Sequence, residues 1–136
     1  MEMKKICVEA KDENLYPVLE FAKEFLEEQG CSVKIQMLFE VCMEEWFINV
    51  AHYAYPDQTG PVEVQIKLDE ETVELVFTDS GIPFDPLEKE DPDVTLSTEE
   101  REIGGLGIYL IKKKMDEVSY RYENQKNIFM FRKKIK

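Results

Sequence analysis

The sequence lacks features that mark several classes of protein. Its 136 residues hold only 17 basic side chains against 29 acidic ones, which gives a net charge of −12. Such a chain repels nucleic acid and anionic membranes at long range, so we expect neither as a partner. No run of about 18 apolar residues is present, which excludes a membrane-spanning helix. Without linkers, repeats or a signal peptide, residues 1–136 are expected to form one cytoplasmic domain.

Cysteine and histidine are also scarce. The three cysteines, Cys7, Cys31 and Cys42, are odd in number and show no C-x-x-C spacing. This pattern argues against a disulfide framework or a zinc site and fits a reducing compartment. His52 is the only histidine, and a structural role for it is favoured over a catalytic one.

Hydrophobic residues make up 43% of the chain, enough for a packed core. Apolar periodicity, turn residues and helix caps predict the following order of elements. Strands are expected at 3–9, 62–68, 73–78, 118–122 and 128–131, and helices at 13–29, 33–53 and 104–115. Hairpins grouped with helices indicate a two-layer α/β sandwich, with a mixed, mostly antiparallel sheet and helices on one face. The long polar segment 80–103 is typical of a functional or mobile loop.

The helix at 33–53 carries the first candidate site. Its stretch VCMEEWFINVA is apolar almost all round, which predicts burial on most sides. Glu45 and Asn49 lie four residues apart and share a stripe with core residues. A buried carboxylate is costly unless a metal, water or ligand offsets it. A carboxamide oxygen suits Mg²⁺, and the carboxylate suits a general base. The alternative is that both side chains simply reach solvent or a partner.

Two glycine-containing segments give further candidates. Asp79-Ser80-Gly81 follows a strand directly, so Asp79 can accept a hydrogen bond from a planar ligand that Gly81 lets approach closely. Gly104–Gly107 precedes an apolar helix and can present backbone N–H groups to an anion, which an acidic protein needs in order to hold phosphate. Arg101 lies nearby and is a candidate phosphate contact. The alternatives are an ordinary polar turn and a flexible helix start.

The order of these three motifs resembles the nucleotide-binding motifs of the GHKL ATP-binding superfamily, which includes gyrase, histidine kinases and mismatch-repair ATPases. The segments EEWFINVAHYAYPD, DSGIPFDP and IGGLGIYLIKKKMDEVSY are most similar to its anti-sigma-factor serine kinase branch. The resemblance runs from about residue 33 to the C-terminus. It implies a Bergerat-type fold with ATP between the helices and a lid at about 86–103.

The resemblance also implies roles for single residues. Glu45 is expected to be the general base, Asn49 the Mg²⁺ ligand and Asp79 the acceptor for the adenine amino group. The residues expected to bind ATP and Mg²⁺ are Asn49, Asp79, Gly81, Phe84, Arg101, Gly104, Gly105, Leu106, Gly107 and Ile108. The implied activity is an ATP-dependent serine/threonine protein kinase that phosphorylates a small antagonist protein and sequesters a sigma factor. A homodimer is compatible with this branch.

The sequence departs from the superfamily pattern at two positions. Many relatives have histidine where this chain has Tyr53, with His52 one place earlier. The last strand often has a threonine that contacts adenine, whereas this chain has Asn127-Ile128-Phe129-Met130, so the contact is either lost or made by Asn127. A non-catalytic nucleotide-binding or protein-binding module is therefore the alternative function.

Overall fold

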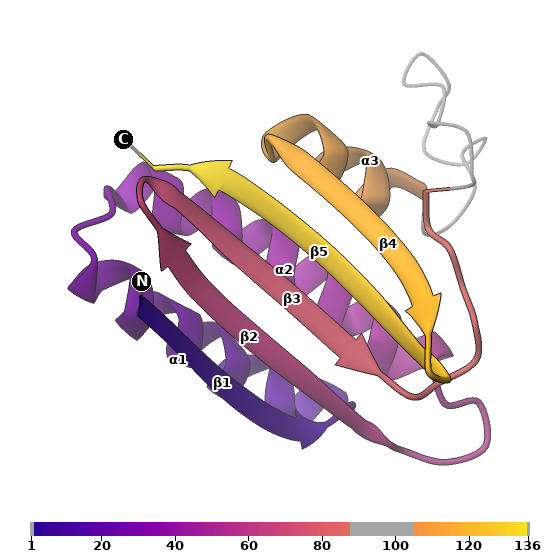
Figure 1. Cartoon of the computed structure of the whole chain (residues 1–136). Helices are drawn as coiled ribbons and strands as arrows, with labels where there is room; N and C mark the ends of the chain where they lie inside the picture. Colours follow the sequence, from indigo (N-terminus) through magenta and orange to yellow (C-terminus); the bar gives the residue numbers. More distant parts are fainter. Residues whose placement is uncertain (1, 88–104, 136) are drawn as a thin grey trace.

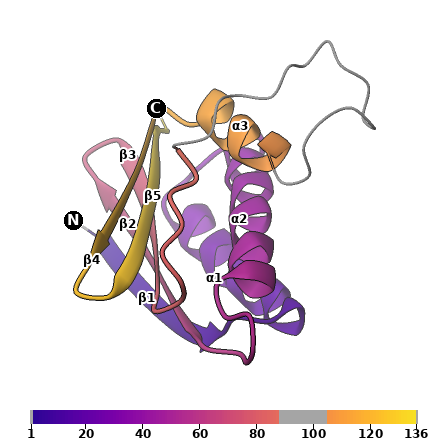
Figure 2. The same cartoon turned by 90° about the vertical axis from the view of Figure 1, so that its right-hand side faces the viewer.

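The computed structural model describes residues 2–87 and 105–135, which form a sheet with helices on one of its faces (Figures 1 and 2). In chain order the elements are β1 (Glu2–Glu9), η1 (Asp12–Asn14), α1 (Leu15–Glu28), α2 (Val33–Tyr53), β2 (Pro61–Asp69), β3 (Thr72–Asp79), α3 (Gly105–Lys114), β4 (Glu117–Glu123) and β5 (Lys126–Lys134). The predicted order of strands and helices is confirmed. Within the two described ranges, none of the helices has the length and apolar character that crossing a membrane requires.

The five strands lie in the order β1-β2-β3-β5-β4, and every recorded pair is antiparallel. The two-layer sandwich is confirmed, and the sheet is more regular than the mixed sheet that was predicted. The reason is that β5 turns back from β4 and enters beside β3 in the opposite direction. Both predicted hairpins have tight turns, with positive φ at Glu70 in one and at Asn124 and Gln125 in the other.

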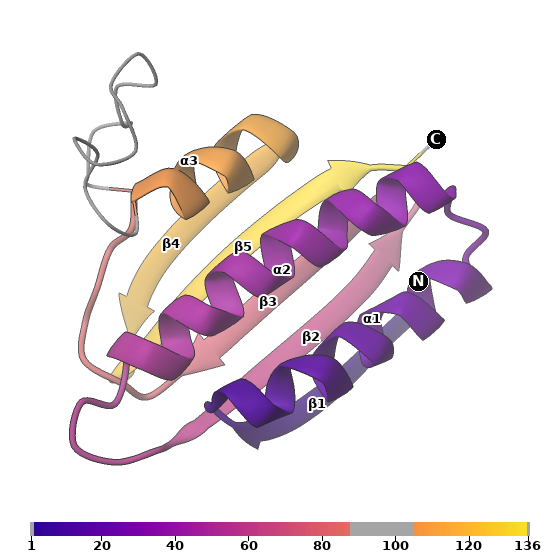
Figure 3. The same ribbon diagram turned by 180° about the vertical axis from the view of Figure 1, so that it is seen from behind.

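The helices cover one face of the sheet, with α1 over β1 and β2 and α2 over β3 and β5 (Figure 3). The α2 helix begins where the sequence predicts, because the Ser32 side chain accepts a hydrogen bond from the Ile35 backbone N–H at 3.2 Å. Gly30 ends the α1 segment with a φ of 77°, a conformation that glycine tolerates best.

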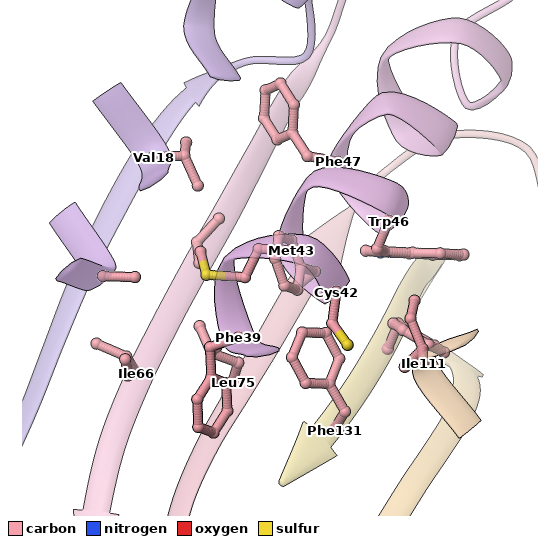
Figure 4. Close-up of a cluster of buried hydrophobic side chains, with 14 of the residues drawn as sticks. Val18, Phe39, Cys42, Met43, Trp46, Phe47, Ile66, Leu75, Ile111 and Phe131 are labelled. Carbon is pink, nitrogen blue, oxygen red and sulfur yellow. The ribbon is translucent and has the colours of Figure 1, made fainter. Parts of the chain in front are cut away.

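The core forms between α2 and alternate residues of the central strands (Figure 4). The core residues of β2, β3 and β5 are all fully buried: Val62, Val64, Ile66, Val73, Leu75, Phe77, Phe129 and Phe131. Two polar side chains continue this alternation at the strand ends, Asp79 on β3 and Asn127 on β5. They are the buried polar residues of the described part of the chain, so the sheet brings both to one place on its helical face.

Candidate functional site

Asp79 lies at the C-terminal end of β3 with only 3% of its surface exposed. Its Oδ1 atom accepts two hydrogen bonds, from the Gly81 backbone N–H and the Asn127 side-chain amide, both at 2.9 Å. Burial raises the pKa of Asp79, and the bonds from Asn127 and Gly81 lower it in part. Among the described residues, no hydrogen bond to Oδ2 is recorded, so this oxygen is the acceptor available to a ligand.

Asn127 is directly opposite Asp79 in the β3–β5 register and is equally buried, at 3% exposure. Its amide nitrogen also donates to the Ile82 carbonyl at 2.9 Å, and more weakly to the Gly81 carbonyl at 3.4 Å. Its carbonyl oxygen accepts from the Phe84 backbone N–H at 3.2 Å and from the Tyr120 hydroxyl. Asn127 therefore links the Asp79 carboxylate to the turn that follows β3.

Tyr55 fixes the same turn from the other side. Its hydroxyl donates to the Pro61 carbonyl at 2.7 Å and accepts from the Ser80 backbone N–H at 2.8 Å. Burial raises the pKa of Tyr55, so the hydroxyl keeps its proton as a donor. A Cβ at Gly81 would collide with the carbonyl oxygen of Ala54, just beyond the end of α2. Only glycine permits this close approach between the turn and α2.

Glu45 and Asn49 lie one turn apart on α2, as predicted. The expectation that Glu45 is a buried carboxylate is wrong: its side chain is exposed, and Asn49 is half-buried. The sheet and the two flanking helices do not enclose α2, and apolar Met37 and Val41 on this helix are also exposed, at 59% and 43%. The apolar character of α2 therefore does not show which of its residues are covered.

The first turn of α3 lies against Glu45. A Cβ placed on Gly107 would lie 2.5 Å from the Glu45 Oε2 atom, so this glycine leaves room for the carboxylate. Gly105 and Leu106 belong to the same helical turn, and Ile108 packs into the core with 8% exposure. Arg101, Gly104 and residues 88–103 of the expected lid lie outside the described residues.

Trp46 forms an aromatic cluster beside the Asp79 turn. Its indole stacks on Phe129 with ring centroids 4.1 Å apart and lies nearly parallel to Phe84, with centroids 6.5 Å apart. It extends from α2 over β5, on the side where Ile111 of α3 lies (Figure 4). Within the described part of the chain its buried indole N–H has no hydrogen-bond partner. Phe84, which was expected to contact the nucleotide, therefore belongs to this cluster through its ring and is bonded to Asn127 through its backbone N–H.

His52 lies on the surface, away from these contacts. Its Nε2 atom is 2.8 Å from an oxygen of Asp12, which joins the end of α2 to η1. This partner supports the structural role over the catalytic one.

Chemically, the site combines the buried Asp79 carboxylate, the exposed Glu45 carboxylate of α2 beside the start of α3, and the Asn49 carboxamide. Asp79 can accept a bond from a planar donor, Glu45 can accept a proton, and the backbone N–H groups at the start of α3 suit a phosphate. The sequence did not identify Tyr55, Trp46 or Tyr120 as part of the site. Asn127 was considered only as a possible adenine contact, and its bond to Asp79 was missed because the strand was predicted to start at residue 128, whereas β5 begins at Lys126.

Comparisons with known proteins agree with this fold. A family model described as a histidine kinase-like ATPase domain matches residues 8–133. The serine-protein kinase RsbW of Bacillus cereus strain AH187 is 26% identical over 95 residues, which cover 67% of this chain. RsbW of Bacillus thuringiensis subsp. konkukian strain 97-27 gives the same values. The aligned segment spans only 59% of the length of these curated relatives.

Two solved structures share the fold. The RsbU and RsbW domains of Rv1364c from Mycobacterium tuberculosis superpose with a TM-score of 0.72 and 13% identity, over 99% of this chain and 33% of that one. The nucleotide-free catalytic domain of the histidine kinase ThkA gives a TM-score of 0.54 and 12% identity, over 99% of this chain and 98% of that one. At these identities the structures establish the fold alone.

Proposed function

Because the chain belongs to the family of histidine kinase-like ATPase domains, we propose that it is an ATP- and Mg²⁺-dependent serine/threonine protein kinase. In this proposal it acts as an anti-sigma regulatory factor, phosphorylating a small antagonist protein and sequestering a sigma factor. The curated relatives described as serine-protein kinases support this activity, although the chain spans 59% of their length. The proposal that an antagonist protein and a sigma factor are the partners rests on the resemblance of the sequence motifs to the anti-sigma-factor serine kinase branch.

The site fits ATP at the base-recognition end. Asp79 keeps one carboxylate oxygen without a described partner, which suits the amino group of adenine. Gly81 supplies a backbone without a side chain beside that carboxylate. The N-terminus of α3, with Gly105, Leu106 and Gly107, suits the phosphates because helix N-termini carry unpaired N–H groups and partial positive charge.

Asn49 is the proposed protein ligand of Mg²⁺. Among the described residues, no cluster of three His, Cys, Asp or Glu side chains is placed to hold a metal. A single carboxamide oxygen is nevertheless adequate, since Mg²⁺ in kinases takes most of its ligands from phosphates and water. When bound, the ion neutralises charge on the phosphates.

The observation that carries the kinase proposal is the contact between Glu45 and Gly107. It places a carboxylate beside the helix N-terminus proposed for the phosphates. There Glu45 can take the proton from a serine or threonine hydroxyl of the acceptor. Its exposure suits this role, because the hydroxyl belongs to another protein and must reach the carboxylate from solvent.

Replacing Glu45 tests the catalytic role. Glu45→Ala is expected to abolish transfer of the γ-phosphate from labelled ATP to small antagonist proteins, while ATP affinity in calorimetry stays within about threefold. Glu44→Ala is the matched control, because Glu44 is the adjacent exposed glutamate on α2. Loss of ATP binding in Glu45→Ala would show that the residue is structural, and full transfer would exclude it as the base.

Replacing Asn49 tests the metal role. Asn49→Ala is expected to weaken Mg²⁺-ATP binding at least about tenfold, which corresponds to about 1.4 kcal/mol. Its affinity for ATP in EDTA should match that of the wild type, because the lost contact is made to the ion. An unchanged affinity in Mg²⁺ would contradict the assignment.

A non-catalytic binding module is the second candidate, and the last strand is the observation that favours it. Where the superfamily often has a threonine that contacts adenine, this chain has Asn127, whose amide is bonded to protein groups. This candidate predicts binding of a partner protein with no phosphoryl transfer to any antagonist protein, in the same assay that is used for Glu45→Ala.

A further inference from the structure

The side-chain amide of Asn127 is fully occupied by protein partners. An asparagine amide has two N–H donors, and its carbonyl oxygen has two acceptor positions. The donors engage Asp79 Oδ1 and the Ile82 carbonyl, each at 2.9 Å. The acceptor positions engage the Phe84 N–H and the Tyr120 hydroxyl. No group of this amide is left to bind a nucleobase directly.

The surrounding groups also determine which way the amide points. Its oxygen faces two donors, while its nitrogen faces a carboxylate oxygen and a carbonyl oxygen. Exchanging the two ends would place the NH₂ group against the Phe84 N–H and the oxygen against a carboxylate oxygen and a carbonyl oxygen, losing three of the four bonds; the Tyr120 hydroxyl alone could still pair, as an acceptor. The network therefore permits one orientation, in a region where both Asn127 and Asp79 are 3% exposed.

This orientation constrains the Asp79 carboxylate. Asn127 and the Gly81 N–H both bind Oδ1 at 2.9 Å, so the carboxylate cannot pivot without breaking at least one bond. We propose that Asn127 is a positioning residue for base selection, which acts by fixing Asp79 so that only Oδ2 meets the base. The inference rests on the proposed ATP binding and replaces the alternative in which Asn127 itself contacts adenine.

A fixed acceptor has a consequence for base selectivity. Adenine presents an amino donor at position 6, whereas hypoxanthine presents a carbonyl there and carries its donor at the neighbouring N1. A carboxylate that could pivot would reach N1–H and accept inosine triphosphate as well. A carboxylate fixed by Asn127 meets the 6-carbonyl instead, acceptor against acceptor. Sites built to bind a donor reject analogues without it strongly.

The test compares the affinities of Mg²⁺-ATP and Mg²⁺-ITP by calorimetry. The wild type is expected to prefer ATP by at least about 100-fold. In Asn127→Leu and Asn127→Ala this preference is expected to fall below about tenfold, because neither side chain can donate to Asp79 Oδ1 and the released carboxylate can reach the N1–H of ITP. Asn124→Gly is the control, since it removes an exposed asparagine from the same hairpin at a φ of 54° that glycine accepts.

A purely structural role predicts a different result. It would lower thermal stability and weaken the affinities for ATP and ITP by the same factor, leaving the ratio of the two affinities unchanged. An unchanged ratio in a folded Asn127 variant would therefore overturn the inference. If Asn127→Leu does not fold, Asn127→Ala decides, because its smaller side chain also lacks a donor to Asp79 Oδ1 and adds no bulk to the site. If the wild type binds neither nucleotide, the proposed function fails first and the inference falls with it.

Discussion

At the scale of single residues, Asp79 is a buried carboxyl group whose ionisation destabilises the fold, and it is also the proposed acceptor for the adenine amino group. Burial is the main cause of its raised pKa, outweighing the bonds from Asn127 and Gly81. The folded chain therefore holds this proton to higher pH than the unfolded chain does. The contribution of Asp79 to stability is greatest at low pH and declines as pH rises through its folded-state pKa. The ionised form of the buried carboxylate is therefore costly to the fold, and a ligand that donates to Oδ2 would reduce this cost.

Asp79→Asn is therefore expected to separate stability from binding. The new amide oxygen can accept the same bonds from Gly81 and Asn127, and the buried charge is removed. The free energy of unfolding at pH 7, measured with urea, should equal or exceed that of the wild type. ATP affinity should fall at least about tenfold, because a hydrogen bond to a charged group contributes about 1.5–3 kcal/mol. A lower urea midpoint would contradict this account of Asp79.

At the scale of elements, the start of α3 depends on a glycine inside the helix. Gly107→Ala improves helix propensity by about 0.5–1 kcal/mol. The added methyl group meets only the end of the flexible Glu45 side chain, so folding should tolerate it. We expect thermal stability to be kept or raised, while phosphoryl transfer falls at least about tenfold because the carboxylate is displaced.

The effect of Gly107→Ala is attributed to Glu45, which the affinity for Mg²⁺-ATP can check. If the methyl group acts only by displacing the Glu45 carboxylate, Gly107→Ala should leave this affinity within about threefold in calorimetry, as is expected for Glu45→Ala. A larger loss of affinity would show that Gly107 acts on its own, for example through the phosphates.

The same elements show how far the sequence predicts the structure. The bounds of α2 follow from Ser32 and the apolar pattern, because capping is a local interaction. The exposure of Glu45 does not follow, since it depends on which sides of α2 the other elements cover. The network of Asn127 requires the β3–β5 register, a pairing between residues far apart in the chain. Asp79 was identified because its motif is local, whereas Tyr55 and Tyr120 reach the site through the fold.

At the scale of the whole molecule, the three cysteines report on its packing. All are thiols; Cys7 on the edge strand β1 is exposed, whereas Cys31 and Cys42 are buried. Burial, with a smaller effect of the Glu45 charge, raises the pKa of Cys42 to about 12. The thiolate is the reactive form, so Cys42 should be inert near pH 8.

Titration with Ellman's reagent at pH 8 is expected to show one fast thiol per folded chain, with the other two reacting only on unfolding. Cys7→Ser should remove the fast phase and leave the slow phase unchanged. Rapid reaction of more than one thiol in the folded wild type would contradict the burial of Cys31 and Cys42.

The sheet order also has a consequence for synthesis on the ribosome. β5 follows β4 in the chain but lies between β3 and β4 in the sheet (Figure 1). Until β5 emerges, the strand that pairs with both β3 and β4 is therefore missing, and Asp79 lacks its partner Asn127. A nascent chain halted before β5 cannot form the bond from Asn127 to Asp79, so the proposed base-recognition site is completed only when that strand has left the exit tunnel.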